Sequence, residues 1–97
     1  MSHFEHIMKT LRDNANFLNR YGVEKIGLFG SFTRNEHTSD SDLDFLVKFK
    51  KEAETFDNYM ELKFYLAELF KRDVDLVTEE AIRPEMKDSI MENVKYV

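Results

Sequence analysis

The sequence predicts an α/β (α+β) fold, a small mixed β-sheet of about three strands with helices packed on it. Short apolar runs with branched and aromatic residues are typical of strands. Three such runs occur, at 23–29, 43–49 and 74–78. Apolar residues spaced three and four apart are typical of helices, and this spacing is found over 2–20, over 56–72 and after Pro84. Both element types within 97 residues predict one domain, 1–97.

The composition excludes several classes of protein. There is no cysteine, so disulfides, thiolate metal sites and cysteine nucleophiles are impossible. The net charge of −5 argues against broad binding of nucleic acid, which requires a basic surface. No apolar stretch reaches the length of a membrane span, and the N-terminus lacks an apolar signal region. We therefore expect a cytoplasmic protein that does not contact a membrane.

The first helix is expected over 2–20, with a capping box of Ser2 and Glu5 and with Gly22 as its C-terminal cap. Its expected core-facing residues are Phe4, Ile7, Met8, Leu11, Ala15 and Leu18. His3 and His6 lie one turn apart, a spacing that can bind a transition metal, but two solvated histidines are the favoured interpretation. For His37 a solvated loop residue is favoured over a nucleotide contact.

The first expected strand, 23–29, leads into Gly30 and Ser31. A glycine there lets the backbone approach a ligand closely, and a short helix over 31–35 would offer unpaired N–H groups to a phosphate. Arg34 lies in the first turn, where its charge could contact the same phosphate. This end of the strand is therefore a candidate phosphate site.

The second expected strand opens with Asp42 and Asp44, after a loop over 36–41 in which Asp40 is interpreted as a turn residue. Residues two apart in a strand point to one face, so the two carboxylates can share a hard cation such as Mg²⁺. The rest of the strand, to about Phe49, is apolar on both faces. Such a strand is expected to lie inside the sheet.

The second half of the chain supplies a helix, a strand and a last helix. Thr55 or Asp57 is expected to cap the helix at 56–72, and Phe64 and Tyr65 are assigned to the core or its margin rather than to a partner contact. Asp75 interrupts the apolar strand at 74–78, as either a metal ligand or a surface residue. Arg83-Pro84 opens the last helix, after which residues 94–97 are expected to turn back onto the core.

Taken together, Gly-Ser, an arginine three residues later, and Ser-Asp-x-Asp form one pattern. Its residues here are Gly30, Ser31, Arg34, Ser41, Asp42 and Asp44. The pattern resembles that of the nucleotidyltransferases with a polymerase-β-like core, and more narrowly that of the minimal nucleotidyltransferases (MNT domains), which are often paired with a HEPN-domain protein. Asn35 stands where the pattern has glycine, and Asn tolerates a left-handed conformation.

The resemblance implies a site and a reaction. Asp42, Asp44 and an acid of a later strand, Asp75 in preference to Asp73, would be catalytic and would hold two Mg²⁺ ions. Gly30, Ser31, Arg34 and Ser41 would bind the nucleotide. The implied reaction moves AMP from ATP onto a hydroxyl of a HEPN toxin, so that the protein acts as an antitoxin within a homo- or hetero-oligomer.

Three alternatives stay open. The first is an antitoxin that binds nucleotide and its partner without transfer. The second is a transferase that acts on a small molecule or RNA, against which the acidic balance and the missing second domain argue. The third is an acidic Mg²⁺-binding module, against which the glycine-serine-arginine cradle argues.

Overall fold

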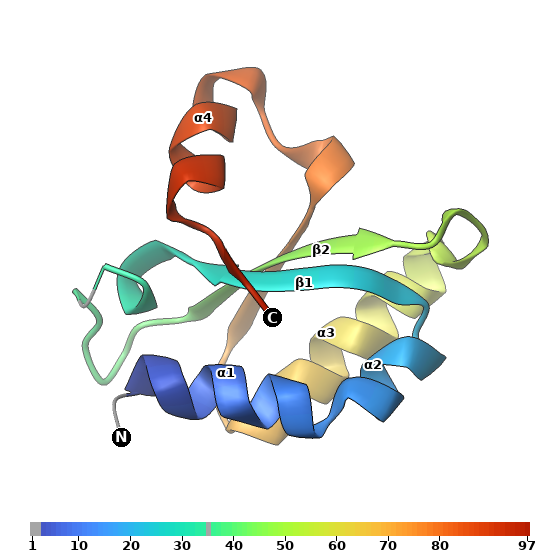
Figure 1. Cartoon of the computed structure of the whole chain (residues 1–97), viewed down its shortest axis with the longest axis horizontal. Helices are drawn as coiled ribbons and strands as arrows, with labels where there is room; N and C mark the ends of the chain where they lie inside the picture. Colours follow the sequence, from blue (N-terminus) through green and yellow to red (C-terminus); the bar gives the residue numbers. More distant parts are fainter. Residues whose placement is uncertain (1–2, 35) are drawn as a thin grey trace.

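The computed structural model describes residues 3–34 and 36–97, and its centre is a four-stranded mixed sheet in the order β3-β2-β1-β4 (Figure 1). β1 (Val23–Phe29) pairs antiparallel with β2 (Leu43–Phe49) and with β4 (Lys95–Tyr96). β3 (Val74–Thr78) is parallel to β2. The predicted fold class is confirmed, and β2 lies inside the sheet as expected. The short β4 is an addition to the three predicted strands, formed where residues 94–97 return to the sheet.

Helices cover both faces of the sheet unequally. α1 (His3–Asp13), α2 (Ala15–Arg20) and α3 (Phe56–Phe70) lie on one face, and α4 (Pro84–Asn93) lies on the other (Figure 1). Three short 3₁₀ turns, Gly30–Phe32, Lys51–Ala53 and Glu79–Ala81, complete the chain path. No helix within the described ranges is long and apolar enough to cross a membrane.

The alternation of side chains along β2 divides the core in two. Leu43, Phe45 and the other residues of that parity pack against α1, α2 and α3 in the main core. Leu46 points to the opposite face and packs against Ile90 and Val94 at the end of α4. The α4 face therefore has a small hydrophobic cluster and leaves room for polar side chains, whereas the other face is covered by three helices.

The first helix is not continuous, which corrects the prediction of one helix over 2–20. It is interrupted at Asn14, whose side-chain amide donates to the Thr10 carbonyl at 2.8 Å and so competes with the helical bonds there. Ala15 is consequently exposed rather than buried. Gly22 has the positive φ (+72°) expected after the helix end, and the predicted Ser2 capping box lies outside the described residues.

Two other helix boundaries differ from the prediction. The turn after β1 spans Gly30–Phe32 rather than 31–35, and Asn35 lies outside the described residues. α3 ends at Phe70 because Lys71 adopts a left-handed conformation (φ 54°). Of the two expected caps of α3, Thr55 is the one used, since its hydroxyl accepts from the Asn58 N–H at 3.2 Å.

Candidate active site

The strand pairing brings three separated residues to one end of the sheet. In the antiparallel pair, Phe29 lies opposite Asp44, so Gly30 follows directly beside that carboxylate. In the parallel pair, Asp44 lies opposite Asp75. Residues opposite one another in a sheet place their side chains on the same face. Asp44 has the parity of Leu46, so this is the face that carries α4.

Gly30 is in contact with the Asp44 carboxylate. It has φ +80°, and a Cβ built on it would overlap Asp44 Oδ2. Thr33 Oγ1 and the Arg34 N–H both contact the Gly30 carbonyl, at 2.7 and 3.3 Å, and so close the turn. The turn thus exposes backbone immediately above a carboxylate, as a site for a metal-bound phosphate requires.

The carboxylates repel one another. Burial, with the charges of Asp75 and Asp42, raises the pKa of Asp44 to about 6, while Arg34 acts to lower it. Among the described residues no three His, Asp or Glu side chains are arranged to hold a metal ion as they stand. The donor set, three carboxylates beside an open backbone turn, is nevertheless of the kind that a hard cation prefers.

The third acid is better represented by Asp75 than by Asp73. Asp75 shares the register and face of Asp44 and raises its pKa, whereas Asp73 precedes β3 and extends the ladder through its carbonyl, which accepts from Leu43 N–H at 3.0 Å. Asp75 is exposed, which agrees with the surface position that was left open for it, and its role as a metal ligand stays a prediction. Asp42 is also exposed, and it lies just before β2 rather than within the strand.

The other expected nucleotide-binding residues lie in or next to the loop that joins β1 to β2. Ser31 is half-buried in the turn after Gly30. Arg34 forms an exposed ion pair with Glu36, with Nε and Oε2 3.2 Å apart. Ser41 Oγ accepts from the Thr38 N–H at 2.8 Å, so this hydroxyl closes a turn just before Asp42. Ser31, Arg34 and Ser41 thus lie on the segment between the turn at Gly30 and Asp42.

Comparison with known proteins identifies the family of this site. The model of the nucleotidyltransferase domain family matches residues 8–97. The chain belongs to this family. It is 38% identical, over the whole of both chains, to a Methanocaldococcus jannaschii protein assigned as a protein adenylyltransferase. It is 38% identical to the protein adenylyltransferase MntA of Thermococcus cleftensis, over 80% of this chain and 78% of that protein.

Solved structures agree with this assignment of a nucleotidyltransferase of the minimal type. One, described as a minimal nucleotidyltransferase, superposes with a TM-score of 0.81 at 28% identity and covers 98% of this chain and 95% of its own. Another, a toxin-antitoxin complex with AMP-PNP, gives a TM-score of 0.68 at 26% identity and covers 97% and 71% of the two chains. The resemblance drawn from the Gly-Ser and Asp-x-Asp pattern is confirmed, and the protein is a nucleotidyltransferase.

Arg72 is a residue of this nucleotidyltransferase that the sequence did not single out. Its Nη1 donates to the carbonyls of Ser39 and Ser41, at 3.1 and 2.9 Å, and its guanidinium lies 5.1 Å from the centre of the Phe32 ring. It therefore fastens the loop that ends in Asp42 to the end of α3. No local pattern indicates this, since Lys71-Arg72 resembles any charged turn before a strand.

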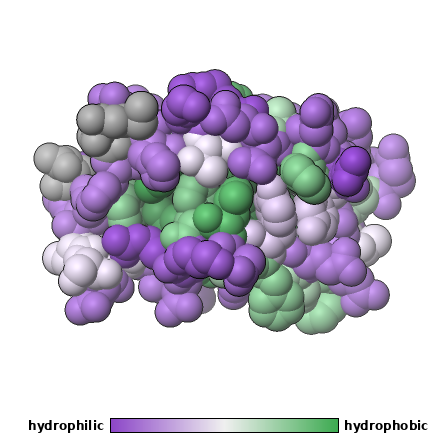
Figure 2. Space-filling view, turned by 90° about the horizontal axis from the view of Figure 1, so that it is seen from below, coloured by the Kyte–Doolittle hydropathy of each residue, from purple (hydrophilic) through white to green (hydrophobic). Residues whose placement is uncertain are grey.

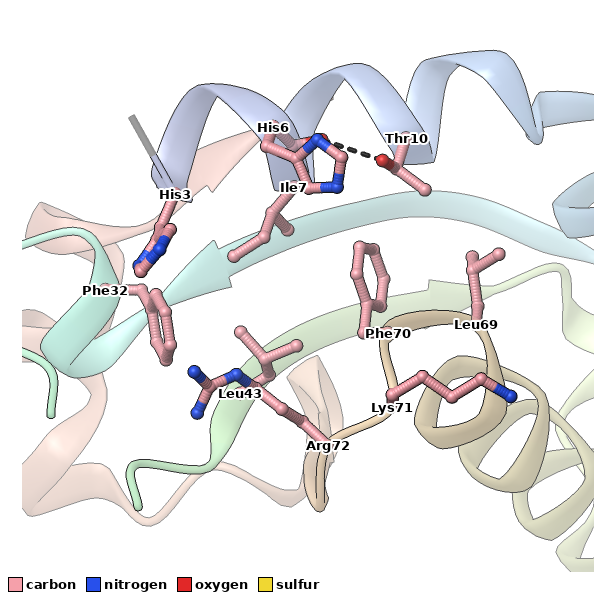
Figure 3. A pocket seen from close by; sticks show the side chains of 10 residues that line it. All are labelled: His3, His6, Ile7, Thr10, Phe32, Leu43, Leu69, Phe70, Lys71 and Arg72. Carbon is pink, nitrogen blue, oxygen red and sulfur yellow. Dashed lines mark hydrogen bonds between the residues drawn. The ribbon is translucent and has the colours of Figure 1, made fainter. Parts of the chain in front are cut away.

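The same arginine lines a pocket of about 370 Å³ on the face of the sheet that α1, α2 and α3 cover (Figure 3). Seen from below, that face gathers hydrophobic side chains in its middle, ringed by hydrophilic ones (Figure 2). In Figure 3, His3 extends from α1 toward Phe32, whereas the His6 side chain lies close to α1 beside Thr10. The pocket and the Asp44 carboxylate thus lie on opposite faces, and Phe32 and Leu43 stand at the pocket side.

His37 differs from its favoured interpretation, whereas His3 and His6 are exposed as expected. His3 Nδ1 and His37 Nε2 are 2.8 Å apart, and the His37 ring stacks on Phe32 with centroids 4.3 Å apart. His37 is therefore half-buried rather than a solvated loop residue. His6 remains exposed, as expected. The His37 stack supports the loop from the face opposite the carboxylates.

Proposed function

We propose that this nucleotidyltransferase transfers AMP from ATP to a hydroxyl of a protein partner, a HEPN-domain toxin, and thereby acts as an antitoxin in the cytoplasm. The observation that carries the proposal is the register of Asp44 with Asp75 beneath the open turn at Gly30. Three features support the partner. The Thermococcus relative is named a protein adenylyltransferase. One structural neighbour is a toxin-antitoxin complex with AMP-PNP, and another is a tri-AMPylated HEPN toxin with its MNT antitoxin.

The carboxylates would bind the metal ions of the reaction. Asp42, Asp44 and Asp75 are the residues that would hold Mg²⁺, and we propose that two ions bind. Bound Mg²⁺ supplies positive charge for the phosphates and lowers the pKa of the acceptor hydroxyl. Asp44, with its pKa raised to about 6, is ionised at neutral pH, so its carboxylate would be negatively charged when a metal ion binds.

The turn after β1 would hold the nucleotide. Gly30 lets the phosphates approach the backbone, and the N–H groups near Ser31 would donate to them. Arg34 is exposed and lowers the pKa of Asp44, so its charge reaches the same space. Asp75 and Asp42 are exposed, whereas Asp44 is half-buried. Asp75 would take the proton from the acceptor hydroxyl.

A second function has an observation in its favour. Arg34 forms an ion pair with Glu36, so its charge is shared with a carboxylate, which suits an antitoxin that binds nucleotide and its partner without transfer. The two functions differ in whether label moves. A transferase labels its partner, whereas a binding-only antitoxin neutralises the partner without labelling it.

The test is a labelling assay with a co-expressed HEPN-domain partner, Mg²⁺ and each α-labelled nucleoside triphosphate, with wild type beside Asp44→Asn. We expect label on the partner from ATP with wild type alone. Label from all four nucleotides would contradict the choice of AMP. Neutralisation of the toxin by Asp44→Asn equal to that by wild type, with no label in either, would favour the binding-only antitoxin.

A further inference from the structure

A groove opens beside the carboxylates on the side of β3 and α3. It has a volume of about 510 Å³, and it is lined by the acids Asp42, Asp73 and Asp75 and by residues of α3 that include Lys63 and Phe64. The groove is thus continuous with two of the three proposed metal ligands. The proposed function leaves Phe64, Lys63 and Asp73 without a role.

Phe64 is the most unusual residue of this groove. Its side chain is 64% exposed, whereas Leu62 and Leu66, two positions before and two positions after it along α3, are fully buried. The expectation that Phe64 belongs to the core or its margin was therefore wrong, whereas Tyr65 is half-buried. α3 is fixed against the sheet here, since the Tyr59 hydroxyl donates to the Leu76 carbonyl of β3. Phe64 is therefore an exposed aromatic surface of the groove that Asp75 also lines, at the β3 edge of the sheet.

The sheet order decides which substrate meets this surface. From one edge to the other the order is β3-β2-β1-β4, with the phosphate turn at the end of β1, Asp44 on β2 and Asp75 on β3. In an in-line displacement the attacking oxygen and the leaving pyrophosphate lie on opposite sides of the phosphorus. A nucleotide whose outer phosphates lie at Gly30 therefore leaves the β3 side to the acceptor.

Charge indicates what surrounds the acceptor hydroxyl. Asp73 is exposed and forms no ion pair with another residue of the described chain, and it is not among the three acids that would hold metal. Its carboxylate would remain negative when the metal ions neutralise the others. An acceptor segment with a lysine or arginine next to the hydroxyl-bearing residue complements it.

We propose that this groove binds the acceptor segment of the protein substrate, with an acceptor tyrosine stacked on Phe64 and a basic neighbour facing Asp73. This assignment rests on the proposed function. The tyrosine oxygen forms a bond to the α-phosphorus, and the bond from that phosphorus to the α–β bridging oxygen breaks. The bridging oxygen leaves with the electron pair as part of pyrophosphate, and the phenolic proton passes to a carboxylate, Asp75, and then to water.

The test compares Phe64→Ala with Phe56→Ala. Phe56 is a matched control because it lies on the same helix and is 76% exposed. It lines a different groove that contains none of the proposed metal-binding aspartates. We expect Phe64→Ala to lower kcat/KM for the acceptor protein about tenfold, mostly through KM, because a stacking partner is lost. The Kd for MgATP should stay within about twofold, and Phe56→Ala should resemble wild type in both measurements.

A second pair of measurements tests the basic neighbour. Asp73→Asn should raise the KM for the acceptor and reduce its dependence on salt concentration, with the Kd for MgATP unchanged. An acceptor peptide whose basic neighbour is replaced by alanine should lose affinity for wild type and not for Asp73→Asn. Equal losses with both proteins would overturn the pairing.

Three outcomes would overturn the groove assignment. Phe64→Ala could use the acceptor as efficiently as wild type, or it could lose MgATP affinity, which would place the base rather than the acceptor on Phe64.

If wild type transfers nothing to protein, the proposed function fails separately. The groove is then tested by the affinity of the partner protein alone, where weaker binding of Phe64→Ala than of Phe56→Ala supports it and equal binding overturns it.

Discussion

Gly30 and Asp44 share one space at the end of the sheet, since a side chain on Gly30 would occupy the position of the Asp44 carboxylate oxygen. The backbone of Gly30 is also left-handed, at φ +80°. Conformation and contact therefore impose the same residue, and the contact is made with the half-buried acid of the proposed metal site.

A comparison of Gly30→Ala with Gly22→Ala should separate the effect of the left-handed backbone from the effect of the contact with Asp44. Gly30→Ala should unfold more easily, by about 1–3 kcal/mol, because of its backbone conformation, and should also lose transfer activity because it displaces Asp44. Gly22→Ala is the matched control, since Gly22 has φ +72° and its added Cβ would meet Ala53, away from the carboxylates. Urea denaturation and transfer rates would check both. A Gly22→Ala protein as inactive as Gly30→Ala would contradict this role.

Without metal, Asp44 should make the fold less stable as pH rises. Its pKa is about 6 in the folded protein and near 3.8 when unfolded, so between these values the folded state holds the extra proton. The free energy of unfolding should therefore fall from about pH 4 to pH 6 and stay lower above it. Asp44→Asn should lack this fall and be more stable at pH 7 by about 1 kcal/mol, a value reduced for the half-exposed position.

Urea denaturation of both proteins in EDTA, at pH 4.5 and pH 7.5, measures that difference. Mg²⁺ should then stabilise the wild type at pH 7.5 and leave Asp44→Asn unchanged, because ligand that binds only the folded state stabilises it. A wild type more stable at pH 7.5 than at pH 4.5 by the same margin as Asp44→Asn would disprove the pKa effect.

The two acids at the start of β3 should not be equivalent. Asp75→Asn should abolish transfer and weaken Mn²⁺ binding, because Asp75 lies opposite Asp44 in the ladder. Asp73→Asn should retain the Mn²⁺ affinity and the rate at saturating acceptor. Paramagnetic broadening by Mn²⁺ would report the metal site in each variant. Wild-type Mn²⁺ affinity in Asp75→Asn together with loss in Asp73→Asn would reverse the assignment.

Arg72 should act on the reaction through the loop that it holds. Arg72→Ala should raise the KM for MgATP about tenfold and speed amide exchange over residues 38–42, because two carbonyl contacts are lost. Arg20→Ala is the control, since the Arg20 guanidinium lies 5.1 Å from the Phe17 ring with the same stacking and no contact to this loop. Unchanged exchange in Arg72→Ala would show that the loop holds itself.

Strand positions were predicted well because local patterns determine them. The bounds of β1 and β3 agree with the apolar runs at 23–29 and 74–78, and Gly30 lies next to Asp44 because Phe29 pairs with Asp44 in the antiparallel ladder. The helix boundaries were less predictable. The interruption at Asn14 depends on one side-chain hydrogen bond, and the end of α3 depends on a left-handed lysine.

What the sequence could not reveal depends on contacts between distant segments. Arg72 reaches the carbonyls of Ser39 and Ser41 only after α3 has been placed, and no pattern around residue 72 indicates it. The exposure of Phe64 was missed because its local sequence pattern pointed to the wrong environment. An aromatic residue in an apolar stripe resembles core, and only the packing of α3 on the sheet shows which side faces out.

The parallel pairing of β2 with β3 has a consequence for how the enzyme is made. Parallel neighbours require the chain to cross from one end of the sheet to the other, and α3 makes that crossing. During synthesis a nascent chain that has emerged only as far as α3 carries Gly30, Asp42 and Asp44 but not Asp75. On the proposed assignment of the three acids, the metal site would be complete only after β3 has been added, so we expect a copy truncated before β3 to lack transfer activity.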